Sequence, residues 1–487
     1  MGNTEKPVFY GRETELAALK RCFESPKAEL VVVYGRRRVG KSALIRKASA
    51  GRRYLEFDGL KGEPTPVQIK HFLHRLSQQT QSPPYDLHGW EAVFQAISPL
   101  LSQGEWILVF DELPWMACGK TRLVHLIKSY WDNHWSKNPK LTLFLCGSIT
   151  TFMVNQVAKS KALYGRPTLL LHLKPMTPGE ALEFFQGRRS LWEAANLLMV
   201  LGGIPKYLEW IQPNQSFAVN LQRLFFEPAA PLFTEYEVLF QEQFGTDSVY
   251  AQIVRALAQR KLTLDELGNG LGWQRTGGLK RYLAYLQNSD FIELEESLDL
   301  STYRKHGPAR TRYKGKKYVL SDPYLRFYFT FVEPHRRLIK QGLSKQGYAQ
   351  LVKDRWESYA GLAFERLCHR QISRILSLLS IPETCVLDYG AYFWQPQRTA
   401  KKNQSSGFQL DMVIVRSDHV YTVIECKFAL RPIGMDVVRN FKNKIHKLKI
   451  PKPVTLEKVL ITAMGATAPV KKSGFFDPIL TLDDILG

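Results

Sequence analysis

The sequence predicts an α/β protein of several domains, with a parallel sheet first, helical domains next and a second α/β domain last. Its 487 residues are too many for one hydrophobic core and fit about three domains. Near the N-terminus, a β-branched strand leads through a glycine-rich loop into a helical pattern. Near the C-terminus, apolar and polar residues alternate over 408–430, as they do in half-buried strands.

The chain is strongly basic, with 67 Lys and Arg against 45 Asp and Glu and a formal net charge of +22. This charge favours a polyanion such as nucleic acid as a partner, although an inert solvated surface is equally compatible with it. No run of about 18 apolar residues occurs, and the N-terminus lacks the apolar core of a secretory signal. We therefore expect a cytoplasmic protein. The six cysteines form no CxxC pair, which fits reduced thiols better than disulfides or zinc.

The glycine-rich loop has the spacing of a phosphate-binding loop. It reads Gly35-x-x-x-x-Gly40-Lys41-Ser42 and follows a strand predicted over Leu30–Tyr34. The glycines let backbone N–H groups turn towards phosphates, Lys41 reaches the β- and γ-phosphates, and Ser42 is a magnesium ligand. The loop therefore predicts a site for ATP and Mg²⁺.

A second predicted strand, "WILVFDELPWM", ends in the acid pair Asp111-Glu112. Beside a phosphate loop, the first acid holds the magnesium shell and the second orients or deprotonates the attacking water. Capping of the next helix is the structural alternative. Further along, "LYGR" exposes Arg166 before another strand, where it could act as a finger on a neighbouring subunit's nucleotide or form a simple ion pair.

Together, "FYGRETELAALK", "VVVYGRRRVGKSALI", "VFDELPWM", "LYGR" and "GGIPKYLEW" resemble the archaeal-type ATPases of the AAA+/STAND assemblage over about residues 8 to 210. The resemblance implies a P-loop AAA+-like core with a helical lid. It implies that Ser148, after the strand "LTLFLCGSIT", senses the γ-phosphate. It also implies that Arg12 contributes to the nucleotide pocket and that Pro205 couples the lid to the nucleotide state. In the alternative, both features are purely structural: Arg12 caps a helix and Gly-Gly-Ile-Pro is a turn.

The middle of the chain, 249–298, reads as helix, short helix, helix and strand. Thr263 and Glu266 form a predicted capping box at the start of the short helix. The pattern predicts a winged helix-turn-helix. The loop 303–317 holds seven basic residues and no acid, which suits contact with DNA phosphates, although winged helices in such ATPases also serve protein contacts or inhibition. These residues are Arg304, Lys305, Arg310, Arg312, Lys314, Lys316 and Lys317.

Near the C-terminus, "FQLDMVIVRSDHVYTVIECKFAL" predicts a hairpin with its turn near Asp418. Folding it there places Asp411 opposite Glu425 and Lys427 on the same side as Glu425. Two opposed carboxylates repel each other, and a divalent cation reverses this. Mg²⁺, or Mn²⁺, fits such a pair, and Lys427 then orients a bound water or stabilises developing charge. The constellation predicts phosphodiester hydrolysis.

These residues resemble the D-x(n)-E-x-K signature of restriction-endonuclease-like, PD-(D/E)XK, nucleases, and Glu365 matches the acid that such folds often supply from a preceding helix. Leu410 stands where the pattern has Pro. The following helix carries the cations Arg439, Lys442, Lys444 and Lys447, well placed to neutralise a nucleic-acid backbone. An ion-paired hairpin in a degenerate nuclease fold that only binds is the alternative.

The sequence thus predicts a P-loop ATPase core over 1–185, a helical lid over 186–245, a winged helix over 246–320 and a restriction-endonuclease-like domain over 321–487. The predicted function is an ATP-hydrolysing, DNA-binding, metal-dependent nuclease that forms homo-oligomers through Arg166. The alternatives are a STAND-type signalling or scaffold ATPase, and a DNA-remodelling motor that does not cleave.

Overall fold

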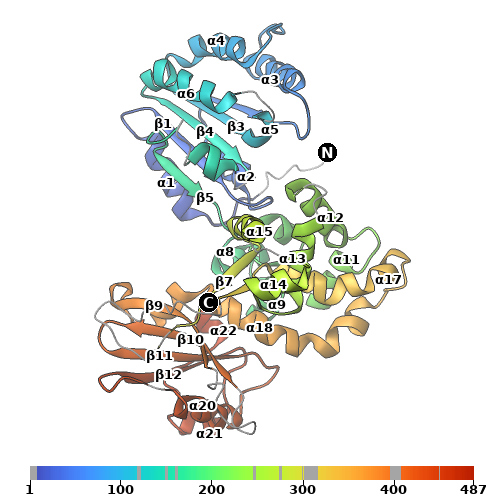
Figure 1. Ribbon diagram of the computed structural model, residues 1–487, viewed down its shortest axis with the longest axis vertical. Coiled ribbons are helices and arrows are strands. Elements are labelled where there is room, and N and C mark those ends of the chain that lie inside the picture. The colour runs from blue at the N-terminus through green and yellow to red at the C-terminus, as the bar shows by residue number, and fades with distance from the viewer. Residues whose placement is uncertain are drawn as a thin grey trace.

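The computed structural model describes residues 8–117, 122–148, 152–158, 163–244, 248–273, 277–298, 300, 316–394, 407–448 and 450–487. The chain forms two sheet-containing parts at the ends of the long axis, with a mostly helical part between them (Figure 1). In the described part of the chain, no helix combines the length and the apolar character that crossing a bilayer requires. The cysteines described there are all free thiols.

The N-terminal sheet is parallel, with the strand order β2-β3-β4-β1-β5. Its strands are apolar on both faces because helices cover both faces. α1 and α2 lie on one face, and α3, α4 and α6 on the other. The strands are β1 (Glu29–Tyr34), β2 (Tyr54–Asp58), β3 (Trp106–Asp111), β4 (Leu141–Gly147) and β5 (Leu169–His172). The helices are α1 (Glu13–Phe23), α2 (Lys41–Ala48), α3 (Thr65–Thr80), α4 (Trp90–Leu101), α5 (Leu113–Met116) and α6 (Leu123–Asn133).

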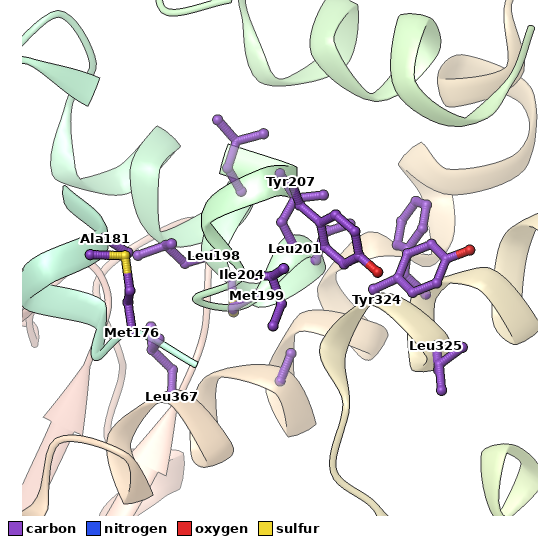
Figure 2. Packing of buried hydrophobic residues seen from close by; sticks show 14 of the residues in the cluster. Met176, Ala181, Leu198, Met199, Leu201, Ile204, Tyr207, Tyr324, Leu325 and Leu367 are labelled. Atoms are coloured by element: carbon purple, nitrogen blue, oxygen red, sulfur yellow. The ribbon is translucent and has the colours of Figure 1, made fainter. Parts of the chain in front are cut away.

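A helical layer follows, formed by α8 (Pro178–Leu182), α9 (Leu191–Leu201), α10 (Pro205–Glu209), α11 (Phe217–Phe225) and α12 (Pro231–Phe244). The later helices α16 (Pro323–Phe327) and α17 (Arg336–Lys340) join this layer. Tyr207 of α10 and Tyr324 of α16 pack with their ring centroids 5.3 Å apart, in one core with Leu198 and Leu201 (Figure 2). The aromatic run that begins at Tyr324 is buried.

Between these helices lie α13 (Ser248–Gln259), β6 (Leu262–Thr263), α14 (Leu264–Gly270), α15 (Gly277–Asn288), β7 (Ile292–Glu295) and β8 (Lys317–Leu320). The three strands form an antiparallel sheet in the order β6-β8-β7. The predicted capping box is confirmed, because Thr263 and Glu266 exchange hydrogen bonds of 2.7 and 3.2 Å. Of the predicted basic loop, only Lys316 and Lys317 lie within the described residues, and Lys316 pairs with Glu296.

The C-terminal sheet is mixed, with the order β13-β12-β11-β10-β9. β9, β10 and β11 are antiparallel, whereas β11, β12 and β13 are parallel. α18 packs on one face and α20 on the other. The elements are α18 (Trp356–His369), α19 (Ile372–Leu378), β9 (Val386–Trp394), β10 (Phe408–Arg416), β11 (Val420–Lys427), α20 (Asp436–His446), β12 (Thr455–Thr462), α21 (Ala468–Lys472), β13 (Ile479–Leu480) and α22 (Leu482–Leu486).

Candidate functional sites

The loop between β1 and α2 has the backbone that a phosphate cradle needs. Gly35 and Gly40 adopt positive φ values of 150° and 92°, which favour glycine. A Cβ atom on Gly35 would lie 2.3 Å from the carbonyl oxygen of Leu173, so no side chain fits there. One on Gly40 would lie 3.8 Å from Cγ of Pro205, which places the proline of the lid beside the loop.

Three predicted nucleotide-site residues meet at this loop. Nζ of Lys41 donates to the carbonyl oxygens of Gly35 and Arg36, both at 3.1 Å, so its ammonium lies within the loop itself. Oγ of Ser42 donates to Oδ2 of Asp111 at 2.5 Å. Because a hydroxyl and a carboxylate are the hard oxygen donors that Mg²⁺ prefers, this pair fits the ion that the sequence predicts.

Glu112 and Ser148 also meet, at the carboxyl ends of β3 and β4. Oε2 of Glu112 accepts hydrogen bonds from the backbone N–H of Ser148 at 3.1 Å and from its hydroxyl at 2.8 Å. The Glu112 backbone adopts φ 47°, in the left-handed region, which turns the chain immediately after Asp111. The two acids at the end of one strand therefore have different partners, Ser42 and Ser148.

Arg12, which precedes α1, contacts the phosphate loop. Its guanidinium donates to the carbonyl oxygens of Val39 at 3.3 Å and Lys174 at 2.7 Å, and it pairs with Glu15. Arg12 thus joins α1 to the loop, and its predicted contact with the nucleotide stays a prediction.

Arg166 forms a bidentate ion pair with Asp132 of α6, with distances of 2.7 and 2.8 Å. This hydrogen-bonded partner lowers the pKa of Asp132. Within this chain Arg166 is therefore an ion-paired residue. Its predicted action on a second subunit stays a prediction.

Two arginines inside the phosphate loop reach the helical layer. Arg36 pairs with Asp322, the N-cap residue of α16, and both side chains are only 1% exposed. Arg38 pairs with Glu235 of α12 at 2.7 Å. The loop is thereby fixed to two helices, through partners 286 and 197 residues further along the chain. The sequence indicated no partner for either arginine.

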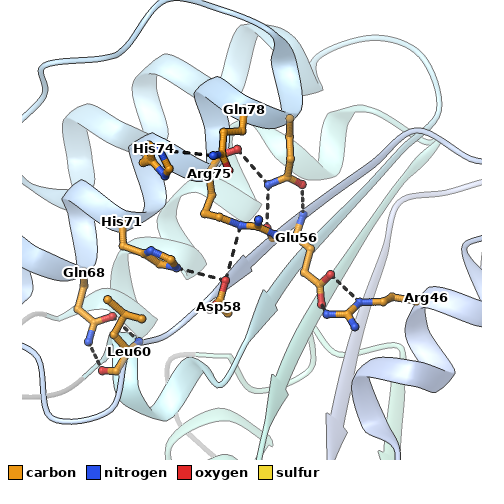
Figure 3. A network of polar contacts seen from close by, with 10 residues as sticks. Arg46, Glu56, Asp58, Leu60, Gln68, His71, His74, Arg75 and Gln78 are labelled. Carbon is orange, nitrogen blue, oxygen red and sulfur yellow. Dashed lines mark hydrogen bonds and ion pairs between the residues drawn. The ribbon is translucent and has the colours of Figure 1, made fainter. Parts of the chain in front are cut away.

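The helix after the loop is attached to the sheet by a further ion pair. Arg46 of α2 and Glu56 of β2 form two hydrogen bonds, of 2.8 and 2.9 Å (Figure 3). On the same strand, Asp58 faces His71 and Arg75 of α3. The Arg46–Glu56 pair joins the sheet to α2, whose first residues are Lys41 and Ser42, and the Asp58 contacts join it to α3.

The predicted register of the C-terminal hairpin is confirmed. Met412 pairs with Ile424 and Val413 with Val423, and continuing this register places Asp411 opposite Glu425. Oδ2 of Asp411 accepts from the backbone N–H of Cys426 at 2.9 Å. Both carboxylates are buried.

Two lysines neutralise this carboxylate pair. Nζ of Lys427 lies 2.7 Å from Glu425 and 3.7 Å from Asp411. Nζ of Lys444, on α20, lies 2.7 Å from both Oε1 and Oε2 of Glu425. Burial and the charge of Glu425 raise the pKa of Asp411. Burial lowers the pKa of Lys427, but the charges of Asp411 and Glu425 outweigh this effect, and the pKa is raised.

Glu365 approaches from α18, the helix on the opposite face from α20. Its Oε1 accepts a hydrogen bond from Gln409 at 2.7 Å, two residues before Asp411. Burial and the charge of Asp411 raise the pKa of Glu365 to about 7. One turn further along α18, His369 contacts the backbone carbonyl oxygen of Asp411 at 2.8 Å. The structure therefore brings Glu365 to the site, although from the other side of the sheet.

Glu365→Gln is expected to reduce the pH dependence of stability. The carboxyl group takes up a proton on folding between its ordinary pKa of 4.5 and about 7, so the free energy of unfolding falls as pH rises through this window. Urea unfolding at about pH 5 and about pH 8 measures the difference, which should be smaller in the variant. Glu357→Gln, at an exposed position of the same helix, should keep the wild-type difference. An unchanged difference in Glu365→Gln would contradict the expectation.

A β-bulge lies at Asp411. Leu410 pairs with Tyr392 of β9, whereas Val413 pairs with Gly390, so β10 has one extra residue between these pairs. A bulge re-aims side chains locally. The sequence analysis did not assign the bulge, because the alternation of apolar residues carries no signal for one inserted residue. It also did not assign Gln409, His369 or Lys444 to this site.

Among the described residues, no group of three or more His, Cys, Asp and Glu forms a ready metal cluster. Asp411 and Glu425 are two carboxylates, and Mg²⁺ is commonly bound by one or two carboxylates together with waters and a phosphate oxygen. The donor set fits a hard divalent cation, with Lys427 and Lys444 neutralising the same oxygens in its place.

Residues 328–436 match a family model, DUF234, described as archaea bacterial proteins of unknown function. This range contains Glu365, Asp411, Glu425 and Lys427. The uncharacterized protein MJECL04 of Methanocaldococcus jannaschii is 28% identical over 379 residues, which are 77% of this chain and 80% of that protein.

A second protein of that organism, the uncharacterized ATP-binding protein MJ0423, is 50% identical over 40 residues, which are 8% of this chain and 68% of that protein. The chain belongs to the family of MJ0423. The shared segment is short beside the 487 residues of this chain.

Among solved structures, the Walker-type ATPase paby2304 of Pyrococcus abyssi is 19% identical with a TM-score of 0.49, and the match covers 68% of this chain and 98% of that chain. The ORC2 protein of Aeropyrum pernix is 13% identical with a TM-score of 0.42, covering 72% of this chain and 97% of that chain. At these identities and scores, neither structure transfers a residue role to this chain.

Proposed function

We propose that the chain is an ATP-hydrolysing protein that binds DNA through a winged helix and cleaves it in a restriction-endonuclease-like C-terminal domain. The observation that carries the proposal is the cluster of Asp411, Glu425 and Lys427 on adjacent strands, in the register that the D-x(n)-E-x-K pattern requires. The name of the relative MJ0423, an ATP-binding protein, supports the ATPase part of the proposal.

In the ATPase half, backbone N–H groups of the phosphate loop and Lys41 bind the phosphates. Lys41 exchanges the carbonyl oxygens of Gly35 and Arg36 for phosphate oxygens. Ser42 and Asp111 hold Mg²⁺, which when bound neutralises charge on the transferred phosphoryl group. Glu112 orients and deprotonates the attacking water, and Ser148 holds the Glu112 carboxylate in place.

In the nuclease half, Asp411 and Glu425 hold Mg²⁺ or Mn²⁺, which when bound supplies a water of lowered pKa beside the scissile phosphate. Lys427 stabilises the negative charge that develops on that phosphate. Glu365 has a pKa of about 7, so it can accept or donate a proton near neutral pH.

A short segment supports communication between the two halves. Asp322 binds Arg36 of the phosphate loop, and the preceding carbonyl oxygens of Leu320 and Ser321 accept from Arg366 and Arg370. Both of these arginines follow Glu365 on or at the end of α18. We propose that the nucleotide state acts on the position of α18 through this segment.

The proposal also includes DNA binding by the winged helix and assembly of the chain into a homo-oligomer. The strand order β6-β8-β7 and the helices α13 to α15 support a winged helix that contacts DNA, and the net charge of +22 favours the same partner. Arg166 would leave Asp132 to act on the nucleotide of a second copy, which makes a homo-oligomer the working form.

The test is incubation of the full chain with plasmid and linear DNA, Mg²⁺ or Mn²⁺, with and without ATP. The expected result is metal-dependent cleavage that is absent in Asp411→Ala and in Lys427→Ala. Asp418→Ala, in the turn of the same hairpin, is the matched control and should cleave as the wild type does. Cleavage that persists in both site variants, or no cleavage with either metal, would sink the nuclease proposal.

One observation favours a non-cleaving alternative. Lys427 and Lys444 both form ion pairs with Glu425, as they would in a hairpin whose carboxylates serve only ion pairing. DNA-stimulated ATP hydrolysis without cleavage would indicate a remodelling motor. Partner assembly that Lys41→Ala abolishes, with no cleavage under either metal, would indicate a STAND-type scaffold.

A further inference from the structure

The carboxylate of Glu425 is enclosed by two ammonium groups of different origin. Lys427 is two residues away on the same strand and is shared with Asp411. Lys444 comes from α20 and contacts both oxygens of Glu425 at equal distances of 2.7 Å. Lys444 therefore competes with a divalent cation for the oxygens of Glu425.

The charges at the site are balanced without a metal. Asp411 and Glu425 carry two negative charges, and Lys427 and Lys444 carry two positive ones. Adding a divalent cation while both ammonium groups stay would leave two uncompensated positive charges beside a Glu425 side chain that is 2% exposed. Such an excess is costly in a buried site. This excess favours the release of an ammonium group when the metal binds.

Lys444 is the group that can leave. Lys427 forms ion pairs with both Glu425 and Asp411, whereas within the described part of the chain Lys444 forms its hydrogen bonds with Glu425 and acts on Asp411 only through its charge. The Lys444 side chain is 20% exposed and that of Lys427 is 39% exposed, so both flexible side chains reach solvent, and the number of ion-paired carboxylates is what separates the two lysines. Once released, the Lys444 ammonium group can donate a charge-assisted hydrogen bond to a phosphate oxygen of the DNA.

We propose that Lys444 occupies the oxygens of Glu425 when no metal is bound, and that it becomes a phosphate-binding residue when a divalent cation and DNA enter. This inference rests on the proposed nuclease function and deepens it. Lys444 then links two events, because the metal site opens only as a phosphate-binding cation is released. It acts as a positioning residue for the scissile phosphodiester.

The metal part is tested with Mn²⁺ and the nucleotide-free full chain, with free Mn²⁺ measured by electron paramagnetic resonance. Mn²⁺ binding at the Asp411–Glu425 site is identified as the binding that is lost in Asp411→Asn. Lys444→Met should bind Mn²⁺ at this site at least about tenfold more tightly than the wild type, because it removes the competing cation. Lys444→Arg, which keeps the charge, should stay close to the wild type. Lys472→Met, at an exposed position of α21, removes the same charge from another helix; it is the matched control and should not differ.

The phosphate part is tested with the same variants and DNA. Lys444→Met should weaken DNA binding and lower the slope of log K against log salt by about one, as loss of a single phosphate contact does. Cleavage at saturating Mn²⁺ should be slower. Tighter metal binding combined with weaker DNA binding is a pair of opposite changes that a purely structural lysine would not produce.

The outcomes separate the two proposals. If the wild type cleaves DNA but Lys444→Met binds Mn²⁺ no more tightly or keeps the wild-type salt slope, the role of Lys444 is overturned and the nuclease stands. If Lys444→Met binds Mn²⁺ more tightly but the wild type never cleaves, the cation exchange is supported and the nuclease fails. If neither protein binds Mn²⁺ at Asp411 and Glu425, both proposals fail.

Discussion

Asp322→Asn is expected to destabilise the folded chain by about 3–5 kcal/mol, the cost of removing one partner of a buried ion pair. Arg36 and Asp322 are both 1% exposed, and the buried guanidinium would lose the carboxylate with which it is paired. Within the described part of the chain, the Nε and Nη2 atoms of Arg36 already lack hydrogen-bond partners. Asn keeps the cap on the backbone N–H of Leu325, so the change isolates the ion pair from the helix cap.

The measurement is the shift of the urea unfolding midpoint, converted with the wild-type m-value. The matched control is Glu209→Gln, which breaks the exposed pair with Lys206 and should cost less than about 1 kcal/mol. Combining Asp322→Asn with Arg36→Met should restore part of the loss, because the double variant leaves no unpaired charge. A cost for Asp322→Asn no larger than that of the control would contradict the expectation.

The same variant should weaken ATP binding. The carbonyl oxygen of Arg36 accepts a hydrogen bond from Lys41, so a displaced Arg36 displaces the lysine that reaches the phosphates. Nucleotide affinity measured at a temperature where the variant is still folded separates this effect from unfolding. Unchanged affinity would show that the pair stabilises the layer of α16 without acting on the nucleotide.

Glu112→Gln is expected to lower the turnover number for ATP hydrolysis by about 10²–10⁴-fold while leaving ATP binding near that of the wild type. The amide keeps an oxygen that can accept from Ser148 but cannot take a proton from the attacking water. Phosphate release gives the rate, and a fluorescent nucleotide gives the affinity. Lys41→Ala is the contrasting variant and should lose binding itself.

Ser148→Ala provides the control for position. It removes the hydroxyl that donates to Glu112 but keeps the backbone N–H contact, so its rate should fall less than that of Glu112→Gln. Hydrolysis by Glu112→Gln at the wild-type rate would show that Glu112 only caps the turn after β3.

Local pattern was sufficient where chemistry depends on spacing along one element or across one tight turn. The phosphate loop, the acid pair after β3 and the register of Asp411 with Glu425 belong to this class. In each case, a strand ends or turns at a position that the alternation of apolar residues reveals. The same reasoning gave the capping box at Thr263.

Contacts between distant segments were beyond that reasoning. The bulge at Asp411, the approach of Lys444 from α20 and the burial of Arg36 against Asp322 join residues that no short-range pattern relates. The sequence interpretation named Lys444 as one of four helix cations. Only the packing of α20 on the sheet distinguishes it from Lys442.

What the sequence by itself determined is the set of functional groups and their order along the chain, because periodicity and glycine positions define each strand, loop and helix locally. What only the tertiary structure decided is which groups share a site and which neutralise one another. Burial is the physical reason, since a charge removed from water must have a partner, and the partner is chosen by the packing of whole elements. Asp322 is such a partner for Arg36 of the phosphate loop, and Lys444 is such a partner for Glu425.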